Sequence, residues 1–143
     1  MNSTANSAAA ATSKTPTFGA VIRTAAIAGG IAAAVNAALW IIGSLFASIV
    51  VPLPFVVVFS LLLIVLGGVF YWVLSRSLGA RTNRVFVIVA VVFLLLNALG
   101  PVSATMQPPP GVPLFNTATL IVTELMHIVA GVIAIRRLTG VGR

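Results

Sequence analysis

Four long runs of apolar residues, separated by short polar or proline-containing segments, dominate the chain. They cover approximately residues 24–46, 55–75, 85–102 and 116–135. A bilayer core of about 30 Å is crossed by roughly 20 helical residues, so each run is suited to a membrane-spanning helix. The third run is shorter and is expected to recruit residues 82–84. Because the connections are short, we predict an all-α fold with four transmembrane helices in an up-down-up-down bundle.

The connections carry residues that end helices. Pro52 and Pro54 separate the first two runs, a proline run at 108–110 separates the last two, and residues 76–84 form a polar link that we predict to be a loop. Residues 1–17 lack apolar periodicity and are predicted to be a disordered cytoplasmic tail. The transmembrane domain is expected over 18–138, followed by a short cytoplasmic tail at 139–143. A cleaved signal peptide is disfavoured, because the first apolar run exceeds the 7–15 residues of a typical signal core.

Composition supports a membrane protein. The chain is 60% hydrophobic and 6% charged, whereas soluble domains carry about 25% charged residues. Its net charge of +7 does not indicate nucleic-acid binding, since no aromatic residues alternate with the basic ones to form a stacking surface. The absence of cysteine excludes disulfides, thiolate metal sites and cysteine nucleophiles.

The basic residues predict an orientation. All of them flank alternate ends of the apolar runs, and the two opposite connections have none. They are Lys14, Arg23, Arg76, Arg81, Arg84, Arg136, Arg137 and Arg143. Under the positive-inside rule, this asymmetry places both termini of the multi-pass protein in the cytoplasm. Tyr71 and Trp72 are expected in the interfacial aromatic belt at the same side.

Three polar residues inside the apolar runs are the candidate site. Glu124 is the only acidic residue and His127 the only histidine; their spacing places both on one helix face. Asn36 lies at a similar depth in the first run, which is expected to neighbour the antiparallel fourth. We therefore predict an intramembrane polar cluster of Asn36, Glu124 and His127. An ionisable pair at this depth is costly, so Glu124 is expected to be protonated or paired with protonated His127.

The chemistry of this cluster remains open at this stage. It can be structural, joining helices by hydrogen bonds, or it can serve proton, ion or cofactor binding. Glu124 and His127 match half of a di-iron motif, but that site needs further glutamates that the chain lacks. No metal site is predicted. His127 remains a conceivable axial ligand for haem or a chlorophyll-type pigment.

Small residues predict close helix packing. Gly29, Ala33 and Gly43 share a face of the first run with Asn36, and Gly131 shares a face of the fourth run with Glu124. Such faces allow another helix backbone to approach closely. We expect them to contact helices rather than lipid.

The segments Ala33-Ala34-Val35-Asn36-Ala37-Ala38-Leu39-Trp40 and Leu125-Met126-His127-Ile128-Val129-Ala130 resemble those of a family of small bacterial four-span membrane proteins of unknown function. The likeness covers about residues 23–138. It implies a protein of the bacterial cytoplasmic membrane and brings no activity with it.

The function expected from the sequence is helix–helix assembly by a non-enzymatic membrane protein. It would act as a homo-oligomer or as a small accessory subunit of a larger membrane complex. The alternatives are a proton-coupled transporter or channel that uses Glu124 and His127, and haem or pigment binding through His127. The expected partners are the lipid bilayer and membrane proteins, including further copies of the chain, and not nucleic acid. No cofactor is predicted.

Overall fold

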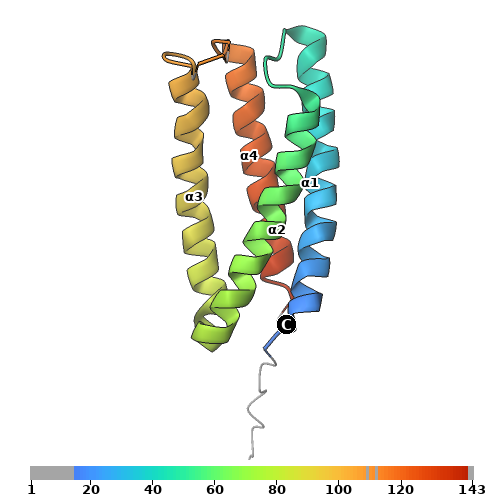
Figure 1. The fold of residues 1–143 in the computed structure, drawn as a ribbon, viewed down its shortest axis with the longest axis vertical. Helices are drawn as coiled ribbons and strands as arrows, with labels where there is room; N and C mark the ends of the chain where they lie inside the picture. The colour runs from blue at the N-terminus through green and yellow to red at the C-terminus, as the bar shows by residue number, and fades with distance from the viewer. Residues whose placement is uncertain (1–14, 109, 112, 142–143) are drawn as a thin grey trace, which may run out of the picture.

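The computed structural model describes residues 15–108, 110–111 and 113–141. Within this part the secondary structure is entirely helical: α1 (Phe18–Phe46), α2 (Leu53–Leu78), the 3-10 turn η1 (Gly79–Arg81), α3 (Thr82–Ala104) and α4 (Thr117–Leu138). The elements run roughly along one long axis (Figure 1). The predicted tail at 1–17 lies almost wholly outside the described residues.

The predicted four-helix bundle is wrong and is replaced by three helical segments. In the described part, the helices long and apolar enough to cross a membrane are Phe18–Phe46, Leu53–Ala104 and Thr117–Leu138. The middle one has 52 residues, because the link predicted as a polar loop is itself helical: α2, η1 and α3 follow one another without a break. Figure 1 shows this segment bending back on itself at η1.

The helical link depends on Gly79 and Thr82. Gly79 has φ +51°, a left-handed conformation that glycine adopts without a steric penalty. The Thr82 hydroxyl then donates to the carbonyl oxygens of Gly79 at 2.7 Å and Leu74 at 3.3 Å. The backbone therefore reverses direction within helical turns, and polar side chains here do not produce an irregular loop.

Helix α1 packs against both α2 and α4. A Cβ atom added at Gly68 of α2 would lie 2.5 Å from the Ala25 Cβ of α1, and one added at Gly29 would lie 3.2 Å from the Leu61 Cα. These distances require small residues at the crossing. Two buried clusters fill the interior, one around Val21, Ala25, Tyr71, Phe86 and Leu138 and the other around Ala28, Ala32 and Ile64.

Tyr71, which the sequence predicted for an interfacial aromatic belt, belongs to the first of these buried clusters. It is 2% exposed, and its hydroxyl donates to Asn83 Oδ1 at 2.7 Å. Asn83 Nδ2 in turn donates to the Thr139 carbonyl at 3.3 Å. Tyr71 therefore joins α2, α3 and the end of α4, which explains why it is buried.

At the opposite end, the segment between α1 and α2 is bound to the start of α4. Asn116 caps α4 by accepting from the Thr119 N–H at 2.7 Å, and its amide donates to the Ser48 carbonyl at 2.8 Å. The Val50 N–H donates to Thr119 Oγ1 at 3.2 Å. The Trp40 indole N–H donates to the Val51 carbonyl at 2.6 Å. These bonds fix the connection against α4 beside the candidate site.

Candidate functional site

Asn36 of α1 is the most buried of the predicted site residues. It is 3% exposed and its amide N–H donates to Ser60 Oγ of α2 at 2.9 Å. Its carbonyl oxygen Oδ1 is buried without a hydrogen-bond partner. Asn36 thus joins α1 to α2, and one acceptor remains unused in an apolar environment.

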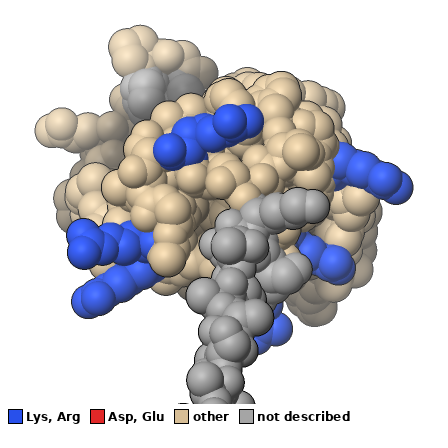
Figure 2. Space-filling view, turned by 90° about the horizontal axis from the view of Figure 1, so that it is seen from below, with Lys and Arg blue, Asp and Glu red and all other residues tan. Residues whose placement is uncertain are grey.

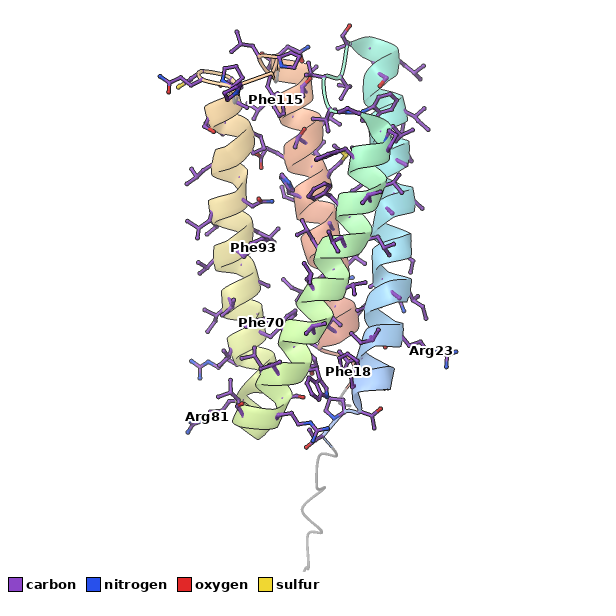
Figure 3. All side chains as sticks on the ribbon, viewed as in Figure 1. Phe18, Arg23, Phe70, Arg81, Phe93 and Phe115 are labelled. Atoms are coloured by element: carbon purple, nitrogen blue, oxygen red, sulfur yellow. The ribbon has the colours of Figure 1, made fainter. Side chains whose placement is uncertain are left out.

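This residue lines a cavity of about 220 Å³ among α1, α2 and α4. The apolar part of the wall includes Phe55 and Phe59, whose rings stack at 4.3 Å between centroids. The polar part consists of Asn36, Ser60, Thr123 and His127. The cavity lies toward the end of the molecule that holds the start of α2 and of α4, the upper end in Figure 3.

Unpartnered polar atoms are concentrated on the residues of this cavity. Asn36 Oδ1, Thr123 Oγ1 and His127 Nδ1 are each buried without a hydrogen-bond partner in the described part of the chain. An unpaired polar group in an apolar medium costs several kcal/mol on solvent-transfer scales, so groups of this kind are normally satisfied. All three atoms belong to residues that line the cavity, so its polar wall has unused hydrogen-bonding capacity.

Glu124 is not among the residues that line the cavity. It is half-buried, and its Oε1 atom is buried without a hydrogen-bond partner. The structure therefore brings Asn36 and His127 to a common cavity and leaves Glu124 outside its lining. Asn36 pairs with Ser60, which the sequence did not single out as a site residue.

Ser60 and Thr123 are the site residues that sequence reasoning missed. Each is a hydroxyl residue in an apolar run, and such residues commonly pack helices or bond to their own backbone. The sequence carried one signal for Ser60, namely its position along its helix. Ser60 lies near the start of α2, and Asn36 lies toward the matching end of α1. Depth alone does not reveal which faces meet.

The predicted packing residues lie at contacts within the chain. A Cβ added at Gly29 would meet Leu61 of α2, one at Gly43 would lie 2.7 Å from Val122 Cγ2 of α4, and one at Gly131 would overlap Leu94 of α3. Ala33 is 7% exposed. This small-residue face of α1 is therefore used internally, and it is not available to another chain.

A second small-residue face of α1 is exposed. Ala26, Gly30, Ala34 and Ala38 recur every four residues, lie on one side of the helix, and are all exposed. A Cβ atom added at Gly30 would meet nothing within 4 Å. Large side chains, such as Ile27, Ile31 and Val35, lie beside this row on α1. Large side chains dominate the exposed surfaces of the other helices, among them Leu62, Leu66, Val92, Leu95, Ile121 and Ile128.

The cations of the described part gather at the end opposite to the cavity. Arg23 lies near the start of α1, three arginines lie around η1, and two lie in the last turn of α4. Figure 2 shows basic side chains around the rim of this end, and Figure 3 labels Arg23 and Arg81 there. All described arginines are exposed: Arg23, Arg76, Arg81, Arg84, Arg136 and Arg137.

No metal site is evident among the described residues, where no group of three or more His, Cys, Asp or Glu side chains comes together. The only ring contact of a cation there is Arg76, whose guanidinium carbon lies 5.1 Å from the Trp72 ring centroid. Apart from the arginines near the helix ends, the polar side chains of the described helices are therefore neutral hydrogen-bonding groups, His127 and Glu124.

The three helical segments that are long and apolar enough to cross a membrane define a small helical protein of membrane type. Residues 16–143 match the model of a family described as "Family of unknown function (DUF6069)", and the chain belongs to this family. No curated protein and no solved structure shows detectable similarity to the chain.

Proposed function

We propose that the protein is a non-enzymatic component of the bacterial cytoplasmic membrane that acts by helix–helix assembly, and that it associates with itself through the exposed face of α1. The single observation that carries this proposal is the row Ala26, Gly30, Ala34 and Ala38 on the outer side of α1, with open space around Gly30.

The physical basis is the absence of a hydrophobic driving force inside a bilayer. Lipid tails are as apolar as leucine, so helices associate by close packing, and interfaces are enriched in small residues spaced by four. Large apolar side chains, such as those on the outer surfaces of α2, α3 and α4, are as well suited to contact with lipid as to contact with another helix. A row of small residues leaves a shallow groove that an identical helix can fill.

The charge distribution supports an orientation. The arginine-bearing end would face the cytoplasm under the positive-inside rule. In that orientation the cavity lies toward the outer half of the bilayer. Arg23 lies at the cytoplasmic end of the proposed α1 interface and is exposed, so its charge can stay at the membrane surface while the small-residue row pairs at greater depth.

The alternatives lack comparable support. Glu124 and His127 lie one turn apart on α4, but Glu124 stays outside the cavity that His127 lines. Among the described residues, no third His, Cys, Asp or Glu side chain gathers with them to continue a proton pathway. The cavity of about 220 Å³ is smaller than the roughly 300–1,000 Å³ of typical ligand and cofactor sites, which disfavours haem or a chlorophyll-type pigment at His127. Assembly is the function that the geometry supports best.

The experiment compares Gly30→Leu with Gly67→Leu. A Cβ atom would meet nothing within 4 Å at either glycine, and both substitutions replace a poor helix former by a good one, so neither should unfold the monomer. Leucine at Gly30 would overpack the proposed interface at a cost of about 1–3 kcal/mol, which is roughly a 5- to 150-fold rise in the dissociation constant.

Association is measured by native mass spectrometry and by fluorescence energy transfer between labelled copies in lipid vesicles. We expect the wild type and Gly67→Leu to associate and Gly30→Leu to be monomeric. A monomeric wild type, or association that Gly30→Leu leaves unchanged, would contradict the proposal. A different membrane protein co-purifying in place of a second copy would replace self-association by accessory-subunit assembly.

A further inference from the structure

We propose that the cavity among α1, α2 and α4 binds a small lipid-soluble molecule with a hydroxylated aromatic ring, of the phenol or hydroquinone class. The proposal does not depend on assembly through α1, because the cavity is built within one chain. It rests on the unpartnered atoms, the aromatic wall, the volume and the lateral access.

The unpartnered atoms define the polar requirement. Asn36 is 3% exposed, and its amide N–H donates to Ser60 Oγ at 2.9 Å. Its unpartnered Oδ1 is an amide oxygen, which only accepts hydrogen bonds. A ligand group that reaches Oδ1 from the cavity must therefore bring an O–H or N–H donor. Thr123 Oγ1, also buried and unpartnered, can donate or accept, so it suits a hydroxyl group that both gives and receives.

The remaining wall defines the apolar requirement. Phe55 and Phe59 stack with centroids 4.3 Å apart and an interplanar angle of 22°, and Met126 on α4 also lines the cavity. Aromatic faces and a methionine sulfur both favour a flat ring. An engineered cavity of about 150 Å³ is known to hold benzene, so about 220 Å³ accommodates one ring with its hydroxyl groups.

Access from the bilayer follows from the exposure of the aromatic wall. Phe55 is 56% exposed and Phe59 41% exposed, so the wall that lines the cavity also reaches the outer surface of α2. A ring dissolved in the lipid can therefore enter from the side, without passing the connection between α1 and α2. Its apolar substituent would remain among the lipid tails.

The test uses two probes that differ in one hydrogen-bond donor. Hexylphenol carries the hydroxyl, and hexylanisole is its methyl ether, which has the same ring and no donor. Binding to the protein in lipid nanodiscs is measured by calorimetry and by the rise in thermal stability. We expect hexylphenol to bind at least about fivefold more tightly, because the ether leaves Asn36 Oδ1 unpaired.

Three variants locate the site. Asn36→Leu should weaken the binding of hexylphenol about 5- to 150-fold and leave the binding of hexylanisole nearly unchanged. Thr123→Val removes a hydroxyl that has no hydrogen-bond partner among the described residues, and it should weaken the binding of hexylphenol about 2- to 10-fold. This variant replaces Asn36→Leu in the test if Asn36→Leu does not fold. Trp72→Phe is the matched control, because Trp72 Nε1 is also buried and unpartnered but Trp72 does not line the cavity.

Comparing hexylphenol with phenol itself identifies the source of the ring. Preference for the tailed probe indicates a membrane-borne ligand, and equal binding indicates a free aromatic alcohol; both agree with the proposed site. The proposal is overturned if the wild type binds no hydroxylated probe, if the ether binds as tightly as the phenol, or if both cavity variants bind as the wild type does.

Discussion

The adjacent glycines of α2 offer a sharp test of how closely α1 and α2 approach. A Cβ atom at Gly68 would lie 2.5 Å from the Ala25 Cβ, whereas one at Gly67 would meet nothing within 4 Å. Gly68→Ala and Gly67→Ala therefore make the same chemical change in the same helical turn. They differ only in whether the new methyl group points at α1.

The expected magnitudes follow from two opposing effects. In a helix, alanine is favoured over glycine by about 0.8–1 kcal/mol, and this gain applies to both variants. Gly68→Ala also overpacks the contact with Ala25, a methyl group that cannot rotate away, and overpacking costs typically about 1–3 kcal/mol. Gly67→Ala should therefore be up to about 1 kcal/mol more stable than the wild type, and Gly68→Ala about 1–3 kcal/mol less stable than Gly67→Ala.

The assay is reversible unfolding of the purified protein in mixed micelles, followed by far-ultraviolet circular dichroism. The compensating change Ala25→Gly, made in the Gly68→Ala background, removes the opposing methyl group and should restore most of the loss attributed to overpacking. Equal stabilities of the two single variants would refute the close approach of α1 and α2. A double variant that is about 0.8–1 kcal/mol less stable than Gly68→Ala, the full cost of replacing a helical alanine by glycine, would also refute this close approach.

Three further predictions concern the cap of α4, the inner face of α1 and the orientation. Asn116→Ala should destabilise the protein by about 0.5–2 kcal/mol in the same unfolding assay, because α4 loses its N-cap and the amide bond to Ser48 at 2.8 Å; no change would show that the cap is not formed. In detergent-solubilised monomers, Ala33→Leu should lower the thermal unfolding midpoint more than Ala38→Leu, since Ala33 is 7% exposed and Ala38 lies on the outer side; equal effects would show that Ala33 does not pack against another helix of the same chain. In intact cells, a cysteine at Thr105 should react with an impermeant reagent and one at Ala80, exposed in η1, should not; the reverse pattern would invert the proposed orientation.

The sequence predicted the helical class because apolar runs of membrane length leave few alternatives. In lipid, all backbone polar groups must be satisfied internally, so long apolar runs become helices. The count of separate segments was wrong at residues 76–84, where the polar residues and Gly79 were taken as a loop. Gly79 at φ +51° instead ends α2 and turns the chain, and the 3-10 turn with the bonds of Thr82 leads directly into α3.

The site was predictable only in part, because it depends on how each helix is rotated about its axis. Two small-residue rows lie side by side on α1: Gly29 and Ala33 turn inward, and Gly30 and Ala34 turn outward. Their composition is nearly the same, so helical periodicity alone does not distinguish the buried row from the exposed one. The Asn36–Ser60 bond was not predictable for the same reason, because its prediction requires knowing which side of α2 faces α1.

Disulfide cross-linking in native membranes tests the proposed assembly through α1 most directly. The chain has no cysteine of its own, so one cysteine placed at exposed Ala34 reports on contact between copies along the outer face of α1. The matched control is a cysteine at Val92 of α3, which is 49% exposed. We predict that mild oxidation yields a covalent dimer of Ala34→Cys and leaves Val92→Cys monomeric; no dimer at Ala34, or equal dimer at both positions, would contradict assembly through α1.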